Sequence, residues 1–178
     1  MILLQGVLKM PKLNEKLKKC LKEGEEGGER HKGLKKIDPD KGLALAHLDK
    51  AMHNLKAMSF FYKNDFSDWS ASAAFYTLYH CLLGLLAKFG YQSKNQECTF
   101  ALIEDLIDKN EILDISKEEL REIFDSDNTI DLENSSMMRD VREDMQYTTK
   151  TLLDDDKFVK LKEKTNLLLE KLRKEIER

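Results

Sequence analysis

The sequence predicts an all-α protein, an antiparallel up-down bundle of about five core helices. Three observations support this class. Apolar residues recur at helical spacing in several segments, and no run alternates apolar with polar residues as a strand does. The 178 residues include only two prolines and eight glycines, so long helices meet few interruptions. The stretch from Trp69 to Ala87 has no formal charge in a chain that is 35% charged, which is typical of a helix buried on several sides.

Residues 1–37 are expected to form an N-terminal extension, and residues 38–178 to form the bundle. Within the extension, a charged helix is predicted over residues 11–24. Residues 25–37 contain three glycines among charged side chains, which predicts a linker or a loosely docked turn. Translation is expected to begin either at the first residue or at Met10, and a start at Met10 would leave the preceding residues absent or disordered.

The first helix of the bundle is predicted to begin at Asp38, which acts as N-cap before a proline in the first helical position. Its apolar spacing continues to about Tyr62. The turn at residues 64–65 is short, so the next helix is expected to return antiparallel to the first.

The central helix is expected from Ser67 to Gly90. Either Ser67 or Asp65 is a suitable N-cap, and Gly90 stands where a left-handed C-cap is needed. Its length would allow a membrane span. Its serines, tyrosines and Trp69 are costly in lipid, and its neighbours are strongly charged, so we expect no membrane insertion.

The remaining helices are predicted from caps and stripes. Two capping-box patterns, Ser93 with Gln96 and Ser116 with Glu119, each start a helix. A polar loop is expected over residues 125–134. One further helix carries the stripe Met138, Val141, Met145, Thr148 and Leu152. The last helix follows three aspartates and carries the stripe Phe158, Leu161, Thr165, Leu168, Leu172 and Ile176.

Charge and cysteine usage limit the possible partners. With 30 basic and 33 acidic residues the chain has a net charge of −3, so nucleotide or RNA binding requires a local patch. Cys20, Cys81 and Cys98 are odd in number and lack paired spacing, which predicts reduced thiols in the cytoplasm rather than a disulfide or a zinc site. No His, Cys or carboxylate set has metal-ligand spacing, so neither metal nor cofactor is expected.

Four segments in order carry a family resemblance: HNLKAMSFFYKNDF, SDWSASAAFYTLYHCLLGLLAKFGY, SKNQECTFALI and VREDMQYTTKTLL. Together they resemble the HEPN domain family, in an archaeal-type branch, from about residue 38 to the C-terminus. The resemblance implies an up-down helical bundle that pairs into a homodimer and binds nucleotide or RNA. Some family members are metal-independent endoribonucleases in toxin–antitoxin or defence systems, and many are encoded beside a minimal nucleotidyltransferase.

The ribonuclease motif of that family is an Arg followed, after four to six residues, by a His near the start of the penultimate helix. Arg142 matches the Arg, but Tyr147 stands where the His is required, and no His follows His80. A phenol with a pKa of about 10 is mostly protonated at neutral pH and is a poor general base. The resemblance therefore implies a non-catalytic or degenerate module. The alternatives are an endoribonuclease that uses Arg142 with Tyr147 or His80, and a structural dimerisation bundle without a ligand.

Candidate ligand-binding residues lie on two predicted helices. On the penultimate helix, Arg142, Gln146 and Thr149 share one face at i, i+4 and i+7, which forms a polar strip. The full set of candidates is Arg139, Arg142, Gln146, Tyr147, Thr149, Lys150, Tyr79 and His80. His80 has two interpretations. It is either a core histidine bonded to a tyrosine or a carbonyl, or part of a polar cavity with Tyr76 and Tyr79 that faces the helix of Arg142.

Overall fold

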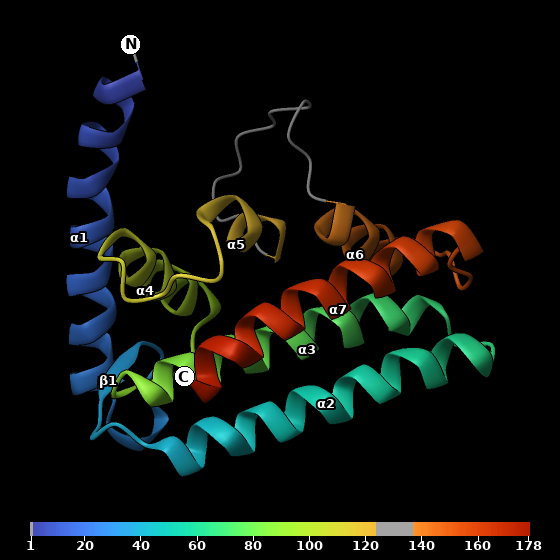
Figure 1. Cartoon of the computed structure of the whole chain (residues 1–178), viewed down its shortest axis with the longest axis horizontal. Helices are drawn as coiled ribbons and strands as arrows, with labels where there is room; N and C mark the ends of the chain where they lie inside the picture. Colours follow the sequence, from blue (N-terminus) through green and yellow to red (C-terminus); the bar gives the residue numbers. More distant parts are fainter. Residues whose placement is uncertain (1, 124–136) are drawn as a thin grey trace.

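A computed structural model describes residues 2–123 and 137–178 of the chain (Figure 1). The predicted all-α class is confirmed, because helices dominate and the described sheet has only two short strands. The elements are α1 (Ile2–Glu26), the 3-10 turn η1 (Gly28–Arg30), β1 (Leu34–Lys36), α2 (Lys41–Lys63), α3 (Asp68–Lys88), β2 (Tyr91–Ser93), α4 (Gln96–Asp108), α5 (Lys117–Ile123), α6 (Met137–Tyr147) and α7 (Asp155–Glu177).

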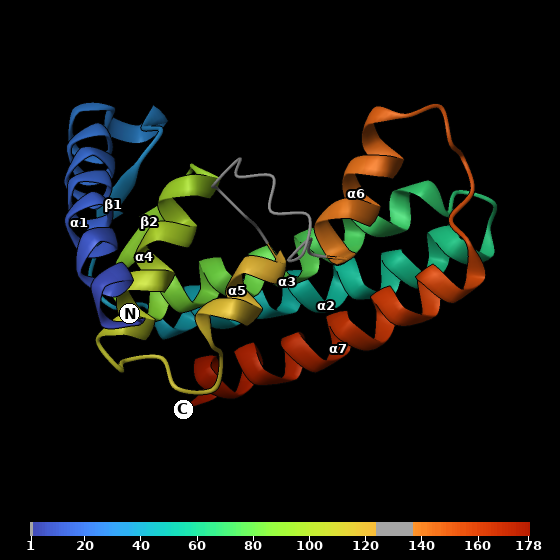
Figure 2. The ribbon, with the colours of Figure 1, turned by 90° about the horizontal axis from the view of Figure 1, so that it is seen from above.

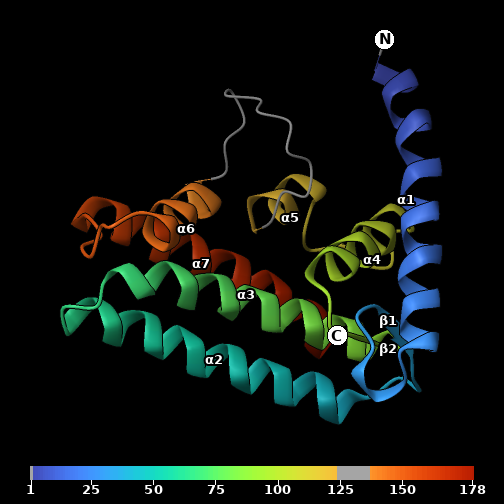
Figure 3. The same ribbon diagram turned by 180° about the vertical axis from the view of Figure 1, so that it is seen from behind.

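Helices α2, α3 and α7 run side by side along the long axis of the molecule (Figures 1 and 2). Helix α3 contacts α2, α4, α6 and α7, so it is the element around which the others pack. Helix α6 lies across one half of α3, while α1 and α4 stand at the opposite end (Figure 3).

Helix α3 is buried on several sides, as its uncharged sequence predicts. Fifteen of its residues are buried. By length and composition it could cross a membrane, but 83% of its apolar window is buried inside the protein, as in the core helix of a bundle. One stripe stays open, because Trp69 and Tyr76 are 57% and 45% exposed. Gly90 has a φ of +81°, so the predicted left-handed cap is confirmed.

The helix starts show how neighbouring capping residues compete. The predicted cap at Asp38 is wrong: Asp40 caps α2, and its Oδ1 accepts a hydrogen bond of 2.8 Å from the Leu43 N–H. Ser67 holds the N-cap position of α3 without capping it, because its hydroxyl accepts a hydrogen bond of 2.8 Å from the Leu153 N–H instead. That bond attaches the segment before α7 to the start of α3.

The two capping boxes have different outcomes. Asn95, not Ser93, caps α4, and its side chain accepts a bond of 3.0 Å from the Cys98 N–H. At α5 the box is confirmed, because Ser116 and Glu119 each accept from the backbone N–H of the other, at 3.2 and 3.1 Å. At α4 the predicted cap Ser93 and the observed cap Asn95 both lie in one short polar run, so the sequence pattern alone did not select the correct residue.

The last two helices largely follow the predicted spacing. All six residues of the α7 stripe are buried, and Asp154 caps this helix through its side chain. Helix α6 ends at Tyr147, so Thr148 and Leu152 lie beyond it and Leu152 is 70% exposed. Leu153 is buried in its place. The predicted loop over residues 125–134 lies outside the described residues.

The N-terminal extension is docked on the bundle rather than joined by a loose linker. Its first helix begins at Ile2, not near Pro11 as predicted. Strand β1 pairs antiparallel with β2, with Leu34 opposite Ser93. A Cβ on Gly24 would lie 1.7 Å from the Leu34 carbonyl oxygen, so this glycine serves close packing, not flexibility.

A disulfide joins Cys20 of α1 to Cys98 of α4, which overturns the prediction of free thiols. The two cysteines are separated by 78 residues, so no local spacing revealed the pair. The cysteine pattern consequently gives no argument for a reducing compartment. Cys81 is free and buried, and burial raises its pKa to about 12, so its thiol is unreactive.

Candidate functional site

Helix α6 positions the candidate strip by burying its apolar side between neighbouring helices. Val141 and Met145 are each 7% exposed and anchor the helix in the core. Arg142 and Gln146 are one helical turn apart, so they share a face that turns toward α3. The prediction that these two polar residues act on one face therefore agrees with their contacts.

The guanidinium of Arg142 lies over an aromatic ring of the central helix. Its guanidinium carbon is 4.0 Å from the centroid of the Phe75 ring, within the range of a cation–π interaction. Its Nε is buried and has no hydrogen-bond partner among the described residues. A buried guanidinium N–H without a partner is energetically unfavourable, so an acceptor that reaches this nitrogen would stabilise the site.

Gln146 supports the same arrangement from the next turn. Its Nε2 donates a hydrogen bond of 3.2 Å to the hydroxyl of Ser72, which is buried on α3. Ser72 and Phe75 are three residues apart and so lie on the same side of α3. The strip on α6 is thus held against α3 at two successive points.

Behind Phe75, a column of aromatic rings extends into the core. Phe75 stacks on Tyr79 with ring centroids 5.6 Å apart, and Tyr79 stacks on Phe100 at 6.2 Å. The Tyr79 hydroxyl lies 3.3 Å from the Thr99 hydroxyl, and burial raises the pKa of Tyr79. Tyr79 is 9% exposed, so it supports the ring beneath Arg142 rather than forming part of an open surface.

His80 is on the other side of α3, where it faces α2. Its Nδ1 is 3.1 Å from Nδ1 of His47, so the pair shares one hydrogen bond between neutral imidazoles. Burial lowers the pKa of both histidines, and the charge of Lys50 lowers that of His80 further. The structure does not bring His80 to Arg142, because adjacent helical residues such as Tyr79 and His80 point about 100° apart.

The other candidates on this part of the chain are dispersed. Tyr147 is 80% exposed at the end of α6. Thr149 lies past the helix end and does not continue the strip. The Lys150 ammonium contacts both carboxylate oxygens of Asp144 at 2.7 and 2.8 Å, so its charge is neutralised locally. Arg139 is on α6 by its backbone, and its side chain is outside the described part of the structure.

A groove between α6 and α7 was not anticipated from the sequence. It has a volume of about 510 Å³ and an apolar floor of Val141, Met145 and Leu153. Asp140 and Asp144 line it from α6, and Lys157 and Lys160 from α7. Because these acidic residues lie on the side of α6 opposite Arg142, the groove and the Arg142 strip are separate features.

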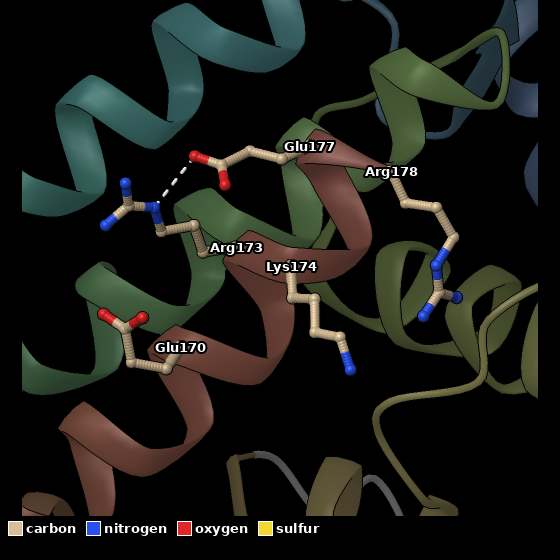
Figure 4. Close-up of a pocket in the computed structure, with 5 residues that line it drawn as sticks. All are labelled: Glu170, Arg173, Lys174, Glu177 and Arg178. Atoms are coloured by element: carbon tan, nitrogen blue, oxygen red, sulfur yellow. Dashed lines mark hydrogen bonds and ion pairs between the residues drawn. The ribbon is translucent and has the colours of Figure 1, made fainter.

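A second hollow, of about 640 Å³, lies along the C-terminal turns of α7 (Figure 4). Its cations are already paired. Arg173 Nε contacts Glu177 at 2.8 Å, Lys174 contacts Asp114 at 2.9 Å, and Arg178 contacts both Asp114 and the buried Glu175. These ion pairs leave little positive charge for an anionic ligand. Within the described residues, no three His, Cys, Asp or Glu side chains are placed to hold a metal ion.

The sequence was compared with models of known protein families. Residues 44–176, which contain the whole of α3, α6 and the site between them, match the family model of the HEPN domain. No curated protein matches the chain.

Proposed function

The chain belongs to the HEPN domain family, and we propose that it is a non-catalytic member that binds the phosphate of nucleotide or RNA beside Arg142. The observation that carries this proposal is the Arg142–Phe75 contact. The ring covers one face of the guanidinium, and the N–H donors along the guanidinium edge are the groups that bind a phosphate in bidentate fashion. The partnerless Nε is one of these donors.

The residues around Arg142 support binding rather than catalysis. Metal-independent RNA cleavage needs a proton acceptor near neutral pH, and Tyr147 occupies the position where the family's nuclease motif has a His. His80 faces His47 on the other side of α3, so it does not replace that base. Loss of a general acid–base typically costs about 10²–10⁴ in rate.

We further propose that the module works as a homodimer through the open stripe of α3. Trp69 and Tyr76 are two turns apart on one face, both are exposed, and the stripe runs beside the face that carries α6. Aromatic side chains of this kind are enriched in protein interfaces. A minimal nucleotidyltransferase, which the family resemblance suggests, is the candidate partner for the assembled dimer.

Thermal unfolding with and without ligand tests the binding proposal. Saturating ATP or a single-stranded RNA oligonucleotide is expected to raise the melting temperature of the native protein by about 5 °C or more. Arg142→Ala should abolish the shift given by ATP and reduce the shift given by RNA. Arg142→Lys should reduce the shift given by ATP, because an ammonium neither stacks nor binds phosphate in bidentate fashion. Arg173→Ala is the matched control, since it removes one exposed guanidinium from α7 and should keep the full shift.

Two outcomes would contradict the proposal. An unchanged melting temperature of the native protein with both ligands, or a full shift in Arg142→Ala, excludes phosphate binding at this site. Cleavage of single-stranded RNA in the presence of a chelator, lost in Arg142→Ala, would replace it with the endoribonuclease alternative.

A further inference from the structure

A group of exposed cations lies outside the α3–α6 site, at the junction of the N-terminal extension and the bundle. Its members, which we name the basic platform, are Arg30, Lys32, Lys35, Lys36 and Lys94. Four of them belong to residues 27–36, a segment with a single carboxylate, Glu29, in a chain whose net charge is −3. All five side chains are exposed. This segment precedes the residues that match the HEPN family.

The two-stranded sheet orients part of the platform outward. Lys35 pairs with Gln92 across the sheet, and the Lys94 N–H donates to the Gly33 carbonyl at 3.3 Å. Alternate residues of a strand share a face, so Lys35, Gln92 and Lys94 project on the same side. Leu34 and Lys36 project to the opposite side, where Leu34 is 1% exposed and Lys36 is exposed. Lys35 and Lys94 are diagonal neighbours, roughly 7–8 Å apart.

The platform cations differ from the lysines of α1 in having no acidic partner. Lys16, Lys19 and Lys22 pair with Glu97, Glu23 and Glu26, respectively. No ion pair joins any platform side chain to a carboxylate within residues 12–123 and 140–178, and Lys94 donates only to the backbone carbonyl of Glu29. None of the platform cations is therefore held in a direct ion pair with a carboxylate of the described residues.

The platform is also held in a fixed arrangement. The Cys20–Cys98 disulfide joins the helix before it to the helix after β2. The His31 ring is buried, and its Nδ1 lies 3.1 Å from the Gly33 carbonyl oxygen. The Ile37 N–H donates to the Gly90 carbonyl at 2.9 Å, which ties the end of β1 to the end of α3. A rigid set of charges loses less conformational entropy when it binds a partner.

We propose that the basic platform is a binding surface for the phosphate backbone of single-stranded RNA, distinct from the Arg142 site. Exposed cations without a direct acidic partner release counterions when they neutralise phosphates, and this drives sequence-independent binding. The outward face of the sheet is polar, whereas surfaces that enter membranes carry exposed Trp, Phe or Leu beside their cations.

The test compares two triple variants of the full chain that remove the same charge. Lys32→Gln, Lys35→Gln and Lys36→Gln are combined in the platform variant, and Lys18→Gln, Lys19→Gln and Lys22→Gln in the α1 control. Binding of a fluorescein-labelled single-stranded RNA of about 20 nucleotides is followed by anisotropy between 50 and 200 mM salt, with about 20 nucleotides spanning a typical single-strand site. All six side chains are exposed, so both variants should keep the native circular dichroism spectrum.

The platform variant is expected to bind RNA at least tenfold more weakly at 100 mM salt. Its slope of log affinity against log salt should fall by about 2, because each lost phosphate contact contributes about 0.7 for a single strand. The α1 control should keep the slope of the native protein. Equal losses in both variants would show an effect of net charge and overturn the proposal, as would native protein that binds no RNA.

Two further measurements, one on Arg142→Ala and one with lipid vesicles, distinguish RNA binding at the platform from RNA binding at Arg142 and from membrane binding. If Arg142→Ala loses RNA binding while the platform variant binds RNA as the native protein does, RNA binds at the α3–α6 site and the platform proposal is overturned. The reverse result supports the platform and contradicts phosphate binding at Arg142. Phosphatidylserine vesicles are used as a second ligand, and platform-dependent binding to vesicles without binding to RNA would assign the surface to a membrane instead.

Discussion

Two positively charged regions lie toward the same end of the molecule and differ in how their charge is compensated (Figures 1 and 2). At the C-terminus of α7, Arg173, Lys174 and Arg178 each contact a carboxylate. In the basic platform, the cations have no such partner among the described residues. The sequence shows both regions as charged runs. The comparison teaches that pairing in three dimensions, not charge count, decides whether a run stabilises the fold or remains available for a ligand.

The largest expected effect comes from removing the Cys20–Cys98 disulfide, which holds the basic platform in a fixed arrangement. Replacing Cys20 and Cys98 together with alanine should lower the free energy of unfolding by about 4 kcal/mol, because the bond closes a loop of 78 residues in the unfolded chain. Urea unfolding of the oxidised native protein and the double variant measures this loss. Cys81→Ala is the control for cysteine replacement and should not weaken RNA binding, whereas the double variant should. Equal unfolding midpoints in the native protein and double variant would refute a structural disulfide.

The ion-paired region at the C-terminus of α7 is tested by replacing its buried carboxylate, Glu175. Glu175 is 1% exposed and accepts hydrogen bonds from the backbone N–H groups of Leu113 and Asp114, at 2.5 and 2.6 Å, and from Arg178. Glu175→Ala removes these acceptors and should cost about 3 kcal/mol of stability.

Glu175→Gln is the matched variant for this prediction, since it retains one acceptor oxygen and should lose less. Arg173→Ala breaks only an exposed pair and should change stability by less than about 0.5 kcal/mol. If Glu175→Ala is no more destabilising in urea than Arg173→Ala, the cluster does not hold the loop before α5 to α7.

The His47–His80 pair differs from both regions, because burial disfavours the positively charged form of each imidazole. Burial lowers the pKa of both imidazoles below the unfolded value, so the unfolded chain binds protons more readily. Their contribution to stability is present above the unfolded pKa of about 6.5 and is lost as the pH falls through the folded pKa values. Urea midpoints from pH 7.5 to 5 should therefore decrease. The decrease should be smaller in the combined variant His47→Gln and His80→Gln, and an identical pH profile would contradict the assignment.

Periodicity predicted the core of this protein well, because burial repeats every turn within one helix. The α7 stripe and the uncharged α3 are examples. Caps were predicted less well, since Asp40 and Asn95 compete with the equally suitable Asp38 and Ser93 two residues earlier. Gly27 and Gly33 were interpreted as part of a linker although they pack closely against backbone, because composition does not reveal the approach of a second segment.

In the candidate site, too, the positions of residues along one helix were predicted, whereas the contacts between helices were not. The shared face of Arg142 and Gln146 follows from helical spacing, and their partners Phe75 and Ser72 also share a face of α3. That these two faces meet is a tertiary contact that no local pattern encodes. His80 was paired with the wrong neighbour for the same reason, since His47 is in register with it only when α2 packs against α3.

The Cys20–Cys98 bond also gives the chain a covalent ring that encloses α2, α3 and both strands. A protease that cuts once inside this ring, for example at the exposed α2–α3 turn, opens the backbone without separating the fragments. The nicked molecule keeps its full mass until a reductant is added.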